Sequence, residues 1–224
     1  MTFATIEHAL EQLRSGRPVL VLDDEDRENE GDAILAAELA SPQWVGWMVR
    51  HTSGYLCAPM EDTRADRLGL PLMWSANTDP LRTRYTVSVD AATSTTGISS
   101  VERAATTRAL ADPRTTSADL IRPGHVLPLR ARDGGVLTRR GHTEAAVDLT
   151  RLAGLQAVGL IGEIVHDDGT CARTPDVLAL GQAEGLDVIT IESLANWRRG
   201  GWLFLMGSTP GSSTTRVSPT VSAQ

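Results

Sequence analysis

Apolar and polar positions along the chain predict an alternation of helices and short strands. Apolar residues recur at helical spacing over residues 6–13, and Thr5 stands before them where a helix cap belongs. Short apolar runs at 18–22 and 33–37 are typical of buried strands. Further helices are predicted over residues 42–49, 61–68, 99–110, 143–153, 175–184 and 192–198. Further strands are predicted over residues 55–59, 85–90, 126–131, 157–165 and 187–191.

The order of these elements predicts an α+β fold, a single domain with a mixed β-sheet and surrounding helices. Helices and strands are mixed without the strict strand–helix–strand repetition of a parallel sheet. Ser99 and Glu102 have the spacing of a capping box at the start of one helix. From Gly200 onward the composition turns to Gly, Ser, Thr and Pro, so we expect a domain over 1–199 and a flexible polar tail over 200–224.

Composition and charge narrow the class of protein. The chain has 224 residues and a formal net charge of -7, from 21 basic and 28 acidic residues, so nucleic acid is not an expected partner. No segment has the pattern of a signal peptide, and no apolar run is long enough to span a membrane, so we expect neither export nor a membrane partner. Cys57 and Cys171 lack CxxC spacing, which argues against a disulfide framework or a structural zinc site and favours the reducing cytoplasm.

Every one of the 21 basic residues is arginine, and the chain has no lysine. A Schiff-base aldolase, a pyridoxal phosphate enzyme and a P-loop each need a lysine amine, so the composition excludes all three. Codon bias can account for the absence, but the chemical exclusion holds in either case. A carbonyl must therefore be activated by a metal ion or by hydrogen-bond donors, and a phosphate must be held by arginine, hydroxyl groups or a helix N-terminus.

Residues 23–32 form an acidic segment with seven carboxylates and one arginine between two predicted strands. Most charge runs are solvated loops without further function. Here, however, the flanking strands are close and Gly31 lets the backbone fold back, so several carboxylates can be directed at one point. Clustered carboxylate oxygens suit a hard cation such as magnesium, and the spacing is not that of an EF-hand.

Residues 139–144, Arg-Arg-Gly-His-Thr-Glu, lead directly into a predicted helix. Free amide groups at a helix N-terminus, together with adjacent arginines, can hold a phosphate group. An ordinary helix cap with exposed arginines explains the same residues equally well. His142 fits either a metal ligand or a capping residue.

Two isolated residues also have chemical interest. His125 precedes a predicted strand, and an imidazole can transfer protons at neutral pH, although a lone histidine is more often structural. Glu163 lies inside the apolar run 158–165, where an unpaired carboxylate is costly to bury, so we expect a cation, a metal or a catalytic role beside it. His8 and His166 are interpreted as structural residues.

Four stretches carry a resemblance to a known family. They are LDDEDRENEGD at 22–32, HTSGYLCAPM at 51–60, RPGHVLPLRARDGGVLTRRGHTEAAVDL at 122–149 and GEIVHDDGTCAR at 162–173. With these stretches in this order, the chain resembles 3,4-dihydroxy-2-butanone 4-phosphate synthase from the first predicted helix to about Trp197. The resemblance implies the fold of that family and the conversion of D-ribulose 5-phosphate to L-3,4-dihydroxy-2-butanone 4-phosphate and formate, a step of riboflavin biosynthesis.

The resemblance also implies the residues of the site. Glu28 and His142 match the metal ligands of the family, with Mg2+ (or Mn2+) as the cofactor. Substrate contacts are matched by Arg27, Glu28, Asp32, Arg139, Gly141, His142, Thr143 and Glu163. His125 and Glu163 match residues needed for catalysis, and we assign them proton transfer without allocating steps. In the family, the metal polarises the C2 carbonyl so that loss of the C3 proton gives a metal-bound enediol, and C4 finally leaves as formate.

The resemblance further implies a homodimer with its sites near the interface and a small-molecule sugar phosphate as substrate. Cys57 and the loop 93–97 are expected to line or cover the pocket. Arg140 stands where we expect a small residue or proline, and it either strengthens phosphate binding or points outward. Many relatives carry a GTP cyclohydrolase domain after this one; none is expected here, so a single activity is predicted.

Two other functions remain open at this point. A different metal-dependent enzyme acting on sugar phosphates, such as an isomerase or aldolase, could use the same residues, and formate production would distinguish the two. A catalytically silent domain that senses a sugar phosphate or nucleotide is the second, and ligand binding without turnover would support it. A dinucleotide oxidoreductase is disfavoured because Gly154, Gly159 and Gly162 do not form GxGxxG.

Overall fold

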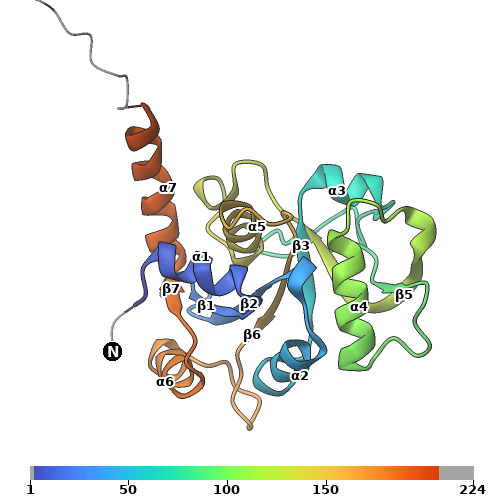
Figure 1. The fold of residues 1–224 in the computed structure, drawn as a ribbon, viewed down its shortest axis with the longest axis horizontal. Coiled ribbons are helices and arrows are strands. Elements are labelled where there is room, and N and C mark those ends of the chain that lie inside the picture. Colours follow the sequence, from blue (N-terminus) through green and yellow to red (C-terminus); the bar gives the residue numbers. More distant parts are fainter. Residues whose placement is uncertain (1–2, 207–224) are drawn as a thin grey trace, which may run out of the picture.

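The sheet is built around two consecutive strands that are buried along their whole length. β1 (Val19–Leu22) and β2 (Gly31–Ala36) pair antiparallel, with Leu22 opposite Gly31, so the acidic segment forms the connection between them. Both strands are buried because helices cover both faces of this part of the sheet (Figure 1). The computed structural model describes residues 3–206 of the chain.

Five more strands complete a mixed sheet. They are β3 (Cys57–Met60), β4 (Val89–Ala91), β5 (Leu120–Arg130), β6 (Gly159–Glu163) and β7 (Val188–Thr190). The strand order is β4-β5-β3-β6-β2-β1-β7. β1 runs parallel to β7 and β3 parallel to β5, whereas the other neighbouring pairs are antiparallel. This order places β6, β2 and β1 side by side, so the end of β6 lies next to the acidic connection.

Two layers of helices cover the sheet (Figure 1). One layer consists of α1 (Ile6–Arg14), α5 (His142–Leu152) and α7 (Ile191–Met206). The other consists of α2 (Pro42–His51), α4 (Ser100–Ala111) and α6 (Thr174–Glu184). The shorter helices are α3 (Asp62–Arg67), η1 (Ala37–Leu39), η2 (Ser117–Asp119) and η3 (Gly135–Leu137). The observed architecture confirms the predicted α+β fold with a mixed sheet.

Side chains along β1 alternate between the two hydrophobic clusters. Val19 and Val21 pack in the cluster that includes α1 and α5, while Leu20 and Leu22 pack in the cluster on the opposite face. Burying an aliphatic side chain of this size stabilises the fold by about 1.5–3 kcal/mol. A slip of one residue would exchange the two sets of side chains, so this alternation fixes the register of β1 against β2.

Side-chain hydroxyl groups cap several helices. Thr5 and Ser99, both predicted caps, accept hydrogen bonds from the backbone N–H three residues later, at distances of 3.3 Å and 3.2 Å. Only half of the predicted capping box at Ser99 forms. The carboxylate of Glu102 bonds to the preceding loop at Thr95 and Gly97 instead of closing the box at the backbone of Ser99.

Strands β5 and β4 differ most from the sequence predictions. β5 begins at Leu120 rather than at 126, because Leu120 and Ile121 already pair with β4. β4 is confined to Val89–Ala91, because Tyr85 and Thr86 make only isolated bridges. The polar and glycine-containing residues between 122 and 125 hide this longer strand from a pattern based on apolar runs.

The last helix continues beyond the predicted domain end at 199. α7 reaches Met206. The remainder of the predicted tail, residues 207–224, lies outside the described part of the chain. Within residues 3–206, no helix combines the length and the apolar character needed to cross a membrane.

Candidate active site

The candidate site lies where three segments meet: the acidic connection after β1, the start of α5 and the end of β6. Asp32 on β2 pairs with Glu163 on β6, so their side chains lie on the same face of the sheet. α5 covers that face and begins with His142, whose imidazole is buried at 6% exposure. The sheet order therefore brings the acidic segment, His142 and Glu163 together.

The carboxylate of Asp23 accepts hydrogen bonds from several residues of the acidic connection. Its Oδ1 accepts a hydrogen bond from the backbone N–H of Glu30 at 2.9 Å, and its Oδ2 accepts one from that of Glu28 at 3.1 Å. Oδ2 also accepts from Nη1 of Arg27 at 2.8 Å. With both oxygens occupied, Asp23 holds the backbone in a closed loop from which Glu28 reaches toward His142.

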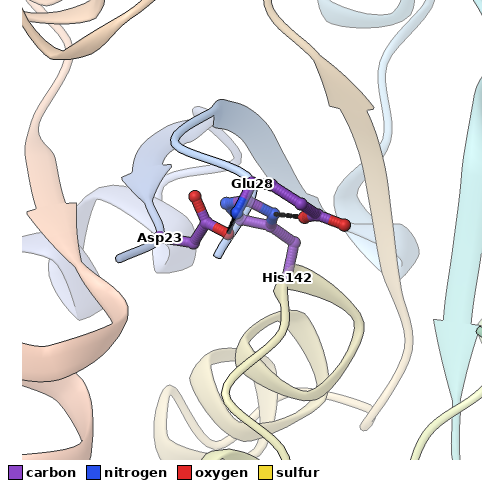
Figure 2. A group of neighbouring side chains, drawn as sticks. All are labelled: Asp23, Glu28 and His142. Carbon is purple, nitrogen blue, oxygen red and sulfur yellow. Dashed lines mark hydrogen bonds and ion pairs between the residues drawn. The ribbon is translucent and has the colours of Figure 1, made fainter. Parts of the chain in front are cut away.

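Figure 2 shows Asp23 and Glu28 coming from this loop and His142 rising from the start of α5, so that the three side chains converge. One ligand atom of each lies within 4.8 Å of the others. Nε2 of His142 lies 3.1 Å from the carbonyl oxygen of Val21, whereas Nδ1 lies 3.7 Å from Oε2 of Glu28 and 3.5 Å from Oδ1 of Asp32. The ring thus presents Nδ1 to the carboxylates.

Charge and burial shift the pKa values of this cluster. Burial alone would lower the pKa of His142, but the carboxylates of Asp32 and Glu28 raise it to about 9. Burial raises the pKa of Asp32 to about 7, although the nearby imidazole acts in the opposite direction. Burial also tends to raise the pKa of Glu28, but hydrogen bonding to His142 and the charge of Arg27 hold it below its usual value.

Asp32 has an unsatisfied atom in this cluster. The residue is 2% exposed, and among residues 3–206 its buried Oδ1 has no hydrogen-bond partner, with Nδ1 of His142 as an ion-pair neighbour at 3.5 Å. A buried carboxylate oxygen without a donor is costly unless a cation or proton accompanies it. Carboxylate oxygens and an imidazole nitrogen can together bind a divalent cation, so the donor set fits a metal.

The structure brings together most of the residues that the sequence predicts. One cavity of about 70 Å³ is lined by Arg27, Glu28, Asp32, Arg139, His142, Thr143 and Glu163. Cys57 lines the same cavity, as expected, and burial raises the pKa of its thiol. Gly141 is the residue immediately before α5, and a Cβ added there would lie 2.2 Å from Nη1 of Arg139.

The start of α5 has an arrangement that suits an anion. Gly141 provides no side-chain cap, so the first backbone N–H groups of α5 lack the hydroxyl acceptor present at α1 and α4. Arg139 lies beside them, held by Oε2 of Glu144 at 2.6 Å and by Oγ1 of Thr83 at 3.2 Å. Free N–H groups next to a fixed guanidinium favour a phosphate group.

Glu163 has a partner that the sequence pattern does not predict. Its Oε2 accepts a hydrogen bond from Oγ of Ser53 at 2.8 Å, and its carbonyl oxygen accepts from the backbone N–H of Ser53 at 2.7 Å. Asp23 is the other residue missed. Ser53 lies within the family-like stretch 51–60 and Asp23 within the acidic segment, but neither spacing indicates which atoms they bind.

His125 does not line this cavity. Its Nδ1 lies 2.7 Å from Oδ2 of Asp90, and its backbone N–H donates to Oδ1 of Asp90 at 2.9 Å. The loop 93–97 lies against this pair rather than in the cavity wall, since a Cβ on Gly97 would meet Asp90 Oδ2 at 2.0 Å. Arg140 also lies outside the wall and pairs with Oδ2 of Asp24 at 3.2 Å.

Carboxylates and an imidazole beside an uncapped helix start and a fixed arginine suit an enzyme that uses a metal ion and a phosphorylated substrate. The chain belongs to the 3,4-dihydroxy-2-butanone 4-phosphate synthase family, whose model matches residues 7–197. The family resemblance of the sequence is thereby confirmed.

Curated relatives are similar over most of the chain. The riboflavin biosynthesis protein RibBA of Salinispora arenicola is 58% identical over 199 residues, which is 88% of this chain and 47% of the relative. RibBA of Mycobacterium tuberculosis is 54% identical over 198 residues, 87% of this chain and 47% of the relative. The chain spans about half the length of these relatives.

Solved structures share the fold. A 3,4-dihydroxy-2-butanone 4-phosphate synthase solved in complex with two magnesium ions superposes with a TM-score of 0.83 at 44% identity, covering 86% of this chain and 95% of that one. The synthase of Candida albicans superposes with a TM-score of 0.82 at 47% identity, covering 88% of this chain and 98% of its own.

Proposed function

We propose that this chain converts D-ribulose 5-phosphate to L-3,4-dihydroxy-2-butanone 4-phosphate and formate, as a step of riboflavin biosynthesis. The observation that carries the proposal is the convergence of Glu28, Asp32 and His142 in the cavity that also contains Arg139 and Glu163. Family membership supports the same reaction.

Glu28 and His142 would hold the metal, magnesium or manganese. The hydrogen bond from Nε2 to Val21 leaves Nδ1 of His142 as the coordinating atom, and Oε2 of Glu28 faces it. Two protein ligands leave most positions of a six-coordinate ion to water and substrate oxygens, which suits magnesium. Bound there, the ion would polarise the C2 carbonyl of ribulose 5-phosphate and acidify the neighbouring C3 proton.

Residues at the start of α5 would bind the phosphate group. Arg139 and Thr143 line the cavity there, and the backbone N–H groups after Gly141 add further donors. Arg27 and Asp32 line the same cavity and would contact substrate hydroxyl groups. Because the guanidinium of Arg139 is already fixed, it loses little conformational freedom when the substrate binds.

Glu163 and His125 would transfer protons. Glu163 faces the cavity, and its bond from Ser53 orients the carboxylate toward a bound substrate. The carboxylate of Asp90 orients the ring of His125 in the same way and leaves Nε2 available. Since His125 lies outside this cavity, we propose that a second copy of the chain brings its own His125 to it.

A homodimer would also complete the binding space. The cavity of about 70 Å³ is much smaller than the roughly 300–1,000 Å³ of typical ligand pockets, so a five-carbon sugar phosphate would extend past its mouth. A second subunit over the mouth would enclose the exposed part of the substrate. Cys57 and Cys171 are both free, which supports action in the reducing cytoplasm.

The test is formate release from purified protein given ribulose 5-phosphate and magnesium. We expect activity in the unmodified protein and its loss with a chelator, in Glu28→Ala and in His142→Ala. His166→Ala is the matched control, because His166 pairs with Asp176 in an exposed turn and should leave the rate unchanged. Turnover without formate would indicate a different sugar-phosphate enzyme. Binding of ribulose 5-phosphate without turnover would indicate a sensor.

A further inference from the structure

We propose that Glu102 is a positioning residue that holds the loop 94–99 against the Asp90 and His125 pair and so fixes the imidazole for proton transfer. The inference rests on the proposed function for its kinetic readout. Its structural readout is independent of that function.

The carboxylate of Glu102 gathers hydrogen-bond donors from the preceding loop. Oε1 accepts from the backbone N–H of Thr95 at 2.5 Å and from its hydroxyl group at 2.8 Å. Oε2 accepts from the backbone N–H of Gly97 at 3.1 Å and from the hydroxyl groups of Ser99 at 3.1 Å and Thr96 at 3.3 Å. Both oxygens are therefore saturated by one short segment.

These bonds go beyond what helix capping needs. A capping box requires the carboxylate to accept only from the first residue of the box, yet Glu102 reaches back to Thr95, Thr96 and Gly97. The hydrogen bonds from Thr95 are the main reason why the pKa of Glu102 is lowered to about 2, so its carboxylate is charged at neutral pH. Glu102 thus orders a loop and does more than start a helix.

The ordered loop touches the histidine pair directly. Gly97 is buried with a φ of 76°, which glycine adopts without strain. A Cβ at this position would lie 2.0 Å from Oδ2 of Asp90 and 2.7 Å from Nδ1 of His125. Gly97 therefore closes over the hydrogen bond between the two side chains, and its own N–H is held by Glu102.

The consequence is a chain of contacts from an exposed carboxylate to the His125 ring. Asp90 holds the ring by Nδ1 and by the adjacent backbone N–H. Displacement of Gly97 would admit water to the bond between Asp90 and His125 and loosen the orientation of the ring. None of these residues lines the cavity with Glu28 and Arg139, so metal and phosphate binding should be insensitive to Glu102.

The test compares Glu102→Gln with Asp112→Asn in the full chain. Asp112 lies at the other end of α4, also bonds to a nearby backbone N–H, and also has a pKa lowered to about 2. We expect Glu102→Gln to lower kcat for formate release about tenfold to a hundredfold, with KM for ribulose 5-phosphate within about twofold. The control should keep the kcat of the unmodified protein.

A spectroscopic readout separates positioning from a general loss of structure. The proton on Nδ1 of His125 should give a downfield NMR signal, assigned by its absence in His125→Gln. In Glu102→Gln we expect the signal to broaden or shift while the thermal midpoint stays close to that of Asp112→Asn. An unchanged signal, or equal kinetic losses in both variants, would overturn the inference. Absence of formate from the unmodified protein would count against the proposed function alone, because the NMR comparison would still decide the role of Glu102.

Discussion

Nε2 of His142 lies 3.1 Å from the carbonyl oxygen of Val21. A carbonyl oxygen only accepts hydrogen bonds, so Nε2 carries the proton of the neutral ring and Nδ1 is left as the lone-pair atom. β1 thereby sets the tautomer of a side chain on α5. Nδ1 is also the atom that faces Glu28 and Asp32, so the backbone leaves the lone pair of the neutral ring directed at these carboxylates, as the proposed metal site requires.

Magnesium binding should release protons. The pKa of His142 in the metal-free protein is about 9, so its ring is protonated at pH 7 and must lose a proton to coordinate a metal. We expect magnesium affinity to rise with pH from 7 to 9, by up to about tenfold per pH unit. Calorimetry in buffers of different ionisation enthalpy would measure the released proton. His142→Gln is the control and should remove most of the pH dependence; the same slope in both proteins would contradict this assignment.

The metal-free protein should lose stability as pH rises. The folded-state pKa of His142, about 9, exceeds its ordinary value of 6.5, so its contribution is fully present below pH 6.5 and is lost as pH rises through 9. Asp32 acts in the same direction between about pH 4 and 7, because its pKa is raised to about 7. Urea unfolding with a chelator should show a decrease in the free energy of unfolding of up to about 3 kcal/mol between pH 6.5 and 9. His142→Gln should flatten this decrease; an unchanged curve for the variant would assign the effect to other groups.

Two arginines next to each other should differ in their effect on stability. Arg140 pairs with Asp24, and their side chains are 35% and 29% exposed, so we expect a coupling of at most about 1 kcal/mol from a double-mutant cycle with Arg140→Gln and Asp24→Asn. Arg139 pairs with Glu144, which is 1% exposed. Arg139→Gln should therefore cost about 3 kcal/mol, because it leaves a buried carboxylate without its cation. Equal losses in the free energy of unfolding for the two arginine variants, measured by urea unfolding, would show that burial does not make the two ion pairs differ.

Gly124 and Gly46 should respond in opposite ways to an added methyl group. A Cβ at Gly124 would lie 2.0 Å from the carbonyl carbon of Val89, so Gly124→Ala must displace backbone and should destabilise by about 1–3 kcal/mol or more. At Gly46, inside α2, the nearest atom is Oγ of Ser100 at 3.6 Å. Gly46→Ala should stabilise by about 1 kcal/mol through helix propensity. Urea unfolding would measure both, and a stabilised Gly124→Ala protein would refute the close approach of β4 and β5.

Local sequence pattern predicts the elements better than their ends. The apolar runs at β1 and β2 and the helical spacing of α1 suffice to place these segments, because burial sets their periodicity. Strand β5 could not be delimited, since pairing with β4 rather than an apolar run determines where it begins. The strand order could not be predicted from the local sequence pattern either, because it depends on contacts between distant segments.

For the site, too, the sequence predicts which residue types are present but not which atoms they contact. The acidic segment and the Arg-Arg-Gly-His run are compatible with cation and phosphate binding but also with a solvated loop and an ordinary helix cap, and only the structure shows Glu28 and His142 together. Asp23 could not be separated from six other acidic residues in the run, because only its hydrogen bonds reveal its structural role. The placement of His125 outside the cavity likewise depends on strand pairing.

The pairing of Asp32 with Glu163 has a consequence for synthesis of the protein. These residues lie far apart in the sequence but opposite each other on β2 and β6. A growing chain on the ribosome therefore carries the acidic segment long before it can supply His142 or Glu163, and closing so long a loop is slow. The proposed cation, held by Glu28 and His142, would bind only after both segments have folded together, so by mass action it would stabilise this folded arrangement over chains that lack the later segment.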